Sequence, residues 1–144
     1  MKLVDVNVLI YAINPSAPAH AAVRAWWLRS LSGDEPIALC WAVISGFLRI
    51  STNPRALERP LSASDAIERV DARLDHPTIC LLAESPRHWT VFQTLLRSAN
   101  IRGSEVNDAH LAALAITHGA TLASCDSDFA RFPELRWENP AVAQ

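Results

Sequence analysis

The chain has 144 residues, of which 50% are hydrophobic and 19% are charged, and its formal net charge is −2. This composition excludes a disordered chain, and the length is enough for one domain with its own core. The small negative charge excludes a general attraction to nucleic acid, so such binding must come from a local patch or a bridging metal ion.

Cysteine usage and hydropathy indicate a cytoplasmic protein without a membrane span. The three cysteines, Cys40, Cys80 and Cys125, are widely spaced and form no C-x-x-C pair. This pattern suits neither a disulfide framework nor a structural zinc site, so we expect the reducing cytosol. No apolar stretch approaches the roughly 20 residues that cross a bilayer, and the N-terminal run is strand-like, unlike a signal peptide.

The first half of the chain alternates short apolar runs with segments of helical spacing. We predict strands at residues 2–4 and 36–40. We predict helices at residues 8–13, 19–31 and 42–50. A turn over residues 5–7 leads into the first helix, and Asn14-Pro15 ends it.

The second half continues the alternation. We predict strands at residues 78–82 and 121–124, with residues 135–137 as a candidate fifth strand at the edge. We predict helices at residues 62–74, 87–99 and 108–118. Ser62 and Asp65 resemble a capping box, whereas Asn107 is predicted to cap the last helix and Gly119 to end it.

This alternation predicts an α/β fold, in which a single domain has a central parallel sheet of four to five strands flanked by helices on both faces. In such folds, ligands usually bind where strand carboxyl ends and helix N-termini meet. Four aspartates fall at such positions: Asp5, Asp108, Asp126 and Asp128. A carboxylate cluster repels itself unless a cation holds it, so we predict a divalent-metal site.

Each acid also has a structural explanation, because an aspartate at a helix start can act as a cap. Their shared edge nevertheless favours Mg²⁺ or Mn²⁺, which prefer hard oxygen ligands. Asp5 and Asp108 are the candidate direct ligands. Asp126 is the candidate for holding a water molecule or a second ion, and Asp128 is a weaker outer candidate.

Two short polar residues, Asn7 and Ser124, lie beside these acids in the sequence. They are suited to orient a carboxylate or a water molecule. Hydrogen bonding within a turn or a helix cap explains them equally well, so both interpretations stay open.

Four segments, in this order and spacing, match one family. They are LVDVNVLIYA at residues 3–12, FLRISTNPR at 47–55, NDAHLAALA at 107–115 and GATLASCDSDF at 119–129. With them the chain resembles the PIN-domain ribonucleases, specifically the VapC toxins of bacterial toxin–antitoxin pairs. The resemblance implies metal-dependent cleavage of structured RNA such as tRNA or rRNA. It also implies a homodimer and a small VapB-type antitoxin whose C-terminal segment blocks the acidic pocket.

By position, Asp5 and Asp108 match the family's metal-binding acids. Asp126 matches a further acid of the pocket, and Asp128 matches the variable acid beside it. For a nuclease, these positions predict that Asp5 and Asp108 hold the ion while Asp126 orients the attacking water.

The sequence departs from the family in one respect. Many members carry a glutamate in the helix before the Phe-Leu-Arg segment, and here Gly46 offers no acid. The pocket therefore has one negative charge less, which puts a second metal ion in question. Glu105 is either a partial substitute or a solvated loop acid.

Three arginines are candidates for contacts to RNA phosphates: Arg49, Arg55 and Arg59. They can equally well only solvate a helix end and the following loop.

Two other functions remain as alternatives. Aspartate-nucleophile phosphatases and receiver domains also place an aspartate after the first strand. The phosphatases, however, need a second acid where Asn7 stands, and both classes need a lysine, for which Lys2 comes too early. A PIN-like scaffold that binds RNA or antitoxin without cutting is the other alternative, and the acid missing at Gly46 favours it.

Overall fold

The sheet at the centre of the protein has five strands, all of them parallel. The structure is a computed structural model that describes residues 1–142. Its strands are β1 (Lys2–Val4), β2 (Ile37–Leu39), β3 (Ile79–Leu81), β4 (Thr121–Ala123) and β5 (Trp137–Glu138). Their order across the sheet is β3-β2-β1-β4-β5. The predicted parallel sheet is therefore confirmed, with the candidate edge strand as its fifth member.

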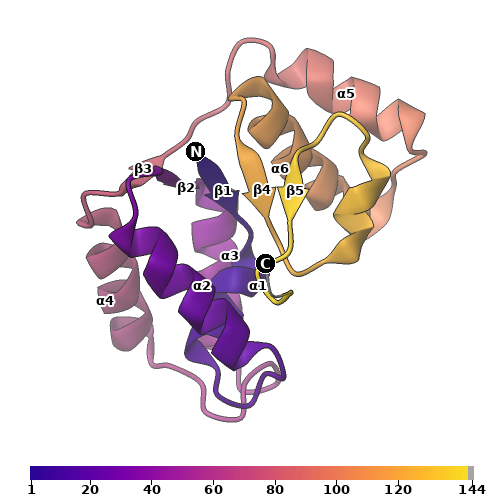
Figure 1. Cartoon of the computed structure of the whole chain (residues 1–144). Coiled ribbons are helices and arrows are strands. Elements are labelled where there is room, and N and C mark those ends of the chain that lie inside the picture. The colour runs from indigo at the N-terminus through magenta and orange to yellow at the C-terminus, as the bar shows by residue number, and fades with distance from the viewer. Residues whose placement is uncertain (143–144) are drawn as a thin grey trace.

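Helices flank the sheet on both faces, as the alternation of the sequence predicts. They are α1 (Val6–Ile13), α2 (His20–Ser32), α3 (Trp41–Ser51), α4 (Ala63–Leu74), α5 (His88–Ser98) and α6 (Val106–Thr117). In Figure 1, α2 and α4 lie on the lower left of the strands, α6 runs behind β4 and β5, and α5 lies at the upper right. Across residues 1–142, none of these helices combines the length and apolarity needed to span a membrane.

Two helix starts differ from the prediction. The helix α1 begins at Val6 without a preceding turn, because the Asp5 carboxylate accepts a hydrogen bond from the Val6 N–H and caps the helix. The helix α6 begins at Val106, since the 3-10 helix η1 (Gly103–Glu105) leads directly into it. Asn107 therefore lies inside the first turn, and its predicted role as the cap is wrong.

The strand order contains one reversal of direction, between β1 and β4. From β1 the chain moves outward to β2 and then to β3, and it returns through α5 and α6 to β4 on the other side of β1. The carboxyl ends of β1 and β4 therefore lie side by side at a topological switch point. In open parallel sheets, this is where ligands bind.

Complete burial fixes the register of these two central strands. Leu3 and Val4 on β1, and Leu122 and Ala123 on β4, are all 0% exposed. Leu3 pairs with Leu122 and Val4 with Ala123. A shift by one residue would break this pairing and carry the polar residues that follow each strand into the core. Burial thus determines which side chains emerge at the carboxyl edge.

At the edge strand β5, one carboxylate joins three elements. Glu138 on β5 accepts hydrogen bonds from the Lys2 ammonium at 2.8 Å and from the Trp26 indole N–H at 3.2 Å. The Lys2 and Glu138 side chains are both mostly buried, so this pair is less screened by solvent than a surface ion pair. It ties the edge strand β5 to β1 and α2.

We expect Glu138→Gln to lower the free energy of unfolding by about 1–3 kcal/mol, because it removes the nearer and more buried of the two carboxylates that pair with Lys2. The other carboxylate, Glu35, lies 3.8 Å from the Lys2 ammonium and is exposed. Chemical denaturation measures this, with Glu134→Gln as the matched control, since Glu134 is exposed and only four residues away. Equal stability of the two variants would show that the network contributes nothing.

Candidate functional site

Asp5 is the structural centre of the site at the switch point. It directly follows β1 and is only 6% exposed. One carboxylate oxygen, Oδ1, accepts the Val6 N–H at 2.6 Å. The other, Oδ2, accepts the Ser124 hydroxyl at 2.7 Å and the Asn7 amide at 2.9 Å. The capping role considered for Asp5 is therefore real, but it uses only one of the two oxygens.

Ser124 joins the ends of the two central strands through its side chain. It directly follows β4 and is fully buried. While its hydroxyl donates to Asp5, the same oxygen accepts the Asn7 amide at 3.0 Å and the Asp126 N–H at 3.1 Å. The Trp137 indole N–H fixes the Ser124 carbonyl at 3.0 Å. Ser124 thus has a defined position from which to orient Asp5.

Asn7 completes this network from the first turn of α1. Its amide N–H group donates to Asp5 and Ser124, and its amide oxygen accepts the Cys125 N–H at 3.1 Å. The prediction that Asn7 and Ser124 lie beside the acids and contact a carboxylate agrees with these contacts.

Asp126 and Asp128 lie in the turn after β4. The Asp126 Oδ1 atom accepts the Asp128 N–H at 2.9 Å and so caps the 3-10 helix η2 (Ser127–Arg131). Asp128 itself is exposed in the first turn of η2. Asp126 therefore has the structural role in a turn that the sequence suggested, although this role uses only one of its carboxylate oxygens.

Asp108 lies in the first turn of α6, where its carboxylate makes no capping hydrogen bond. Its Oδ2 atom instead accepts the Arg131 Nη2 group at 3.1 Å. Arg131 also donates from Nη1 to Glu105 at 2.9 Å. Asp108 thus forms no cap hydrogen bond, although its place in the first turn gives it the favourable interaction with the helix dipole that the sequence predicts. Glu105, considered as a substitute for the missing helical acid, pairs with an arginine.

The pKa values indicate that these acids share one electrostatic environment. Burial raises the pKa of Asp5, and the nearby Asp126 charge raises it further, while hydrogen bonds, first of all from Ser124, lower it. Burial raises the pKa of Asp108 to about 6. The charges of Asp126 and Asp5 add to this increase, and Arg131 opposes it. The Asp126 charge therefore disfavours ionisation of both Asp5 and Asp108.

A cavity of about 350 Å³ opens beside Asp5, with α3 and α6 as two of its walls. Gly46 and Arg49 line it from α3, and Asn107 lines it from α6. A Cβ atom on Gly46 would lie 3.3 Å from the Val6 Cγ2 atom, so the close approach of α3 to α1 depends on this small residue. Position 46, where the sequence lacks the expected glutamate, therefore lies in the wall of this cavity.

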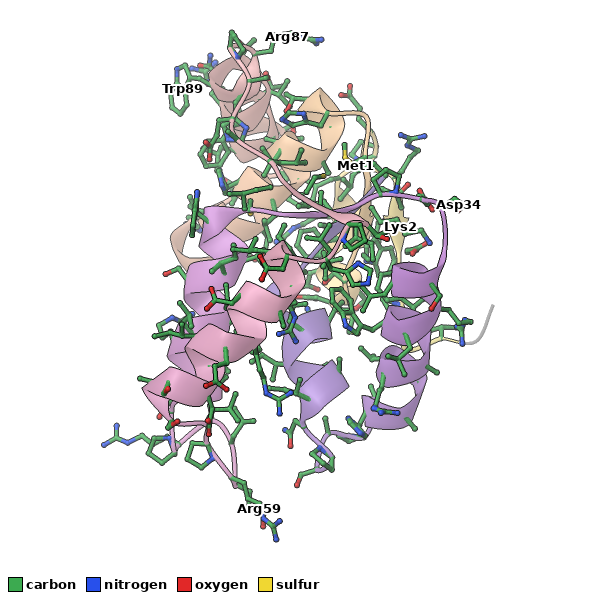
Figure 2. All side chains as sticks on the ribbon, turned by 90° about the vertical axis from the view of Figure 1, so that its left-hand side faces the viewer. Met1, Lys2, Asp34, Arg59, Arg87 and Trp89 are labelled. Carbon is green, nitrogen blue, oxygen red and sulfur yellow. The ribbon has the colours of Figure 1, made fainter. Side chains whose placement is uncertain are left out.

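The three candidate phosphate-binding arginines occupy different places. Arg49 lines the cavity beside Asp5. Arg55 is exposed on the loop after α3. Arg59 lines a second cavity of about 470 Å³, together with Asn14 and Pro15. In Figure 2, Arg59 extends outward at one end of the molecule. Of these three arginines, Arg49 alone lines the cavity beside Asp5, and Asp5 is the one of the four aspartates that lines it.

Arg131 is the charged residue of the site that the sequence interpretation missed. It comes three positions after Asp128, as the first basic residue beyond the acidic turn. That spacing was an available signal. Its pairing with Asp108 and Glu105, however, depends on the path of η2, which no local pattern reveals.

The acids have the chemistry of a hard-cation site, since carboxylate oxygens are what Mg²⁺ and Mn²⁺ prefer. Within residues 1–142, no three Asp, Glu, His or Cys side chains are close enough to form a preformed cluster for one ion. This does not conflict with Mg²⁺ binding, because Mg²⁺ usually keeps several waters and takes one or two carboxylates. Burial, followed by repulsion from neighbouring carboxylates, raises the pKa values of Asp5 and Asp108, and a bound cation would favour the ionised form of both.

Comparison with known sequences gives matches over the whole chain. A profile of the PIN domain matches residues 2–135. VapC ribonuclease Mb2897 of Mycobacterium bovis is 42% identical over 144 residues, which are 100% of this chain and 98% of that protein. Ribonuclease VapC33 of Mycobacterium tuberculosis is 38% identical over 140 residues, which are 97% of this chain and 98% of that protein.

Solved structures share the fold at lower sequence identity. VapBC-1 from nontypeable Haemophilus influenzae matches with a TM-score of 0.70 and 14% identity, over 98% of each chain. VapBC2 from Rickettsia felis, bound to promoter DNA, has a TM-score of 0.67 and 22% identity, over 96% of this chain and 97% of that one. VapC20 of Mycobacterium tuberculosis, a Sarcin-Ricin loop cleaving toxin, has a TM-score of 0.64 and 16% identity, over 90% of this chain and 93% of that one.

The pKa of Asp108 predicts how the metal-free protein responds to pH. Because its pKa rises from 3.8 to about 6 on folding, the stability it contributes is full below about pH 4 and is lost as the pH rises through 6. The wild type therefore loses stability between pH 4.5 and pH 7.5, and Asp108→Asn does not. We expect the free energy of unfolding of Asp108→Asn, relative to that of wild type, to be on the order of 1–2 kcal/mol higher at pH 7.5 than at pH 4.5.

Denaturation of both proteins in chelator at the two pH values measures this difference. Taking the difference between the proteins cancels the titration of groups that they share, such as the histidines. A difference that does not change with pH would contradict the raised pKa.

Proposed function

Because this chain belongs to the PIN-domain family and, within it, to the VapC ribonucleases, we propose that it is the toxin of a type II toxin–antitoxin pair that hydrolyses RNA with Mg²⁺ or Mn²⁺ as cofactor. The observation that carries this proposal is the buried Asp5 carboxylate at the switch point. Its Oδ2 atom is oriented by Ser124 and Asn7. The Asp126 charge raises the pKa of Asp5, and the charges of Asp126 and Asp5 raise the pKa of Asp108 after burial.

The residues that would hold the cation are Asp5 and Asp108, with Asp126 as a further carboxylate of the same pocket and Asp128 at its outer side. When bound, Mg²⁺ or Mn²⁺ supplies a Lewis acid that polarises the phosphodiester and makes water more acidic. The hydrogen bonds from Ser124 and Asn7 restrict the rotation of Asp5 and favour its ionised form.

Asp126 is the candidate for orienting the attacking water. One of its oxygens accepts the Asp128 N–H, and its own N–H is held by Ser124, so the carboxylate has a fixed direction. Arg49 is the phosphate contact that we favour, because it lines the cavity beside Asp5. Arg55 and Arg59 would contact RNA only if a long substrate extended beyond the pocket.

The partners that we propose are a structured RNA such as tRNA or rRNA, a VapB-type antitoxin and a second copy of this chain. Solved relatives of the same fold are VapBC pairs, and VapC20 is described as cleaving the Sarcin-Ricin loop. The exposed Trp41 and Trp89 side chains offer apolar surface for protein contacts. The free cysteines Cys40, Cys80 and Cys125 are consistent with a cytoplasmic location.

A scaffold that binds RNA or antitoxin without cutting is the second candidate. The glycine at position 46 favours it, because it leaves the wall of the cavity beside Asp5 without a further carboxylate. The aspartate-nucleophile alternative has little support. The Asn7 amide donates to Asp5 and Ser124, so it cannot replace the second acid. Lys2, at the start of β1, pairs with Glu138 and does not reach Asp5.

We expect the purified protein to cleave a pool of tRNA and rRNA into discrete fragments with Mn²⁺ or Mg²⁺, and Asp5→Asn to abolish cleavage. The substitution keeps the size of the side chain but removes the charge that would hold the cation. Gel analysis of the fragments gives the readout, with chelator as one control. Asp34→Asn is the matched control, because Asp34 lies near Lys2 at the opposite end of the strands (Figure 2).

Full activity of Asp5→Asn or in excess chelator would exclude this mechanism. No cleavage by the folded, metal-supplied wild type would favour the scaffold or a substrate absent from the pool.

We expect Ser124→Ala to reduce the cleavage rate by roughly 10- to 100-fold, because the Asp5 carboxylate loses the hydroxyl that orients it. Single-turnover rates at saturating Mn²⁺ measure the effect. Ser32→Ala is the matched control, since the Ser32 hydroxyl only donates to a carbonyl of its own helix. Equal rates for the two variants would mean that the hydrogen bond to Asp5 does not matter for catalysis.

A further inference from the structure

Arg131 makes contacts that the proposed mechanism does not use. Its guanidinium donates from Nη1 to Glu105 at 2.9 Å and from Nη2 to Asp108 at 3.1 Å. It also packs over the Phe132 ring, 5.1 Å from the ring centroid. Its third nitrogen, Nε, is buried without a hydrogen-bond partner within residues 1–142. The side chain is thus held in place by two acids and one ring.

The surroundings of Arg131 are strongly acidic. Five acids gather at this edge of the sheet: Asp5, Glu105, Asp108, Asp126 and Asp128. Among the described residues 1–142, Arg131 is the only basic side chain that forms an ion pair with any of them. Arg49 lines the cavity but forms no ion pair within the same range. Arg131 is therefore the basic side chain that directly neutralises part of this acidic cluster.

We propose that Arg131 is the counter-cation of the metal-free site and that it competes with the divalent cation for Asp108. This inference rests on the proposed function, because it takes Asp108 as a metal-binding acid. It assigns to Arg131 a role that limits how tightly the metal binds, apart from any contact with RNA.

The competition follows from the geometry of the ion pair. The Asp108 Oδ2 atom already accepts the guanidinium, so a cation at this carboxylate has one positive charge as its immediate neighbour. Two positive groups at one carboxylate repel each other, and the partly buried position screens this repulsion only in part. The side chain of Arg131 therefore lowers the affinity of Asp108 for a metal ion.

Glu105 makes an exchange feasible. It holds the Nη1 group independently of Asp108, so the guanidinium keeps an acidic partner after it releases Asp108. Removing Arg131 would leave Asp108 and Glu105 without a counter-charge when the metal is absent. The metal-free protein would then be less stable, and the affinity for the metal ion would be higher.

A direct titration with Mn²⁺, without RNA, tests this role. We expect Arg131→Gln to bind Mn²⁺ roughly three- to tenfold more tightly than wild type by isothermal titration calorimetry. In chelator, the same variant should unfold at a lower denaturant concentration. Arg131→Lys, which keeps the charge, should bind Mn²⁺ with close to the wild-type affinity.

Arg87→Gln is the control for the change in total charge, because Arg87 is exposed at the far end of the molecule, beside Trp89 (Figure 2). Its Mn²⁺ affinity should equal that of wild type. A purely structural role of Arg131 predicts that Arg131→Gln loses both stability and Mn²⁺ affinity, so equal or weaker binding overturns the inference. If wild type binds no Mn²⁺, the inference and the proposed metal site fail together, whereas binding without cleavage leaves only the nuclease proposal in doubt.

Discussion

The site depends on a buried carboxylate that has to be satisfied. Asp5 is almost completely removed from solvent, and an ionised carboxylate in that position is costly unless donors surround it. Three donors reach it, from Val6, Asn7 and Ser124. Because Ser124 belongs to the end of β4, the charge of Asp5 also fixes how β1 and β4 end relative to each other.

The parallel sheet makes this arrangement possible over a long sequence separation. Asp5 and Ser124 are 119 residues apart, yet pairing of Val4 with Ala123 brings the residues that follow them together. The edge strand β5 extends this order, since Trp137 pairs with Leu122 and its indole holds the Ser124 carbonyl. Packing in the core and orientation at the site are therefore parts of one hydrogen-bonded and apolar framework.

Much of this was accessible from the sequence, because it follows from periodicity and strand ends. Short apolar runs predicted the strands, and a polar residue directly after such a run in a parallel sheet must emerge at the carboxyl edge. That argument placed Asp5 correctly at this edge, and Asn7 and Ser124, expected beside the acids, contact its carboxylate. Their chemical roles in binding a metal ion stay predictions, since geometry alone does not measure them.

The features that sequence reasoning missed depend on irregular backbone. The helix α6 begins at Val106 and not at the predicted Asp108, because η1 leads directly into it. Asn107 therefore does not cap the helix. Arg131 reaches Asp108 only because η2 folds back toward α6. Helical and strand periodicity carries no information about such short 3-10 segments, so these contacts required the three-dimensional structure.

Gly46 bears on how much positive charge the site can accept. A glutamate there would have to displace the Val6 side chain slightly and would add a carboxylate to a pocket in which burial and repulsion already raise the pKa of Asp5 and Asp108. Glycine avoids both costs. Arg131 partly neutralises Asp108 in addition. The missing acid and the resident arginine thus act in the same direction, because both reduce the negative charge that the proposed cation would meet.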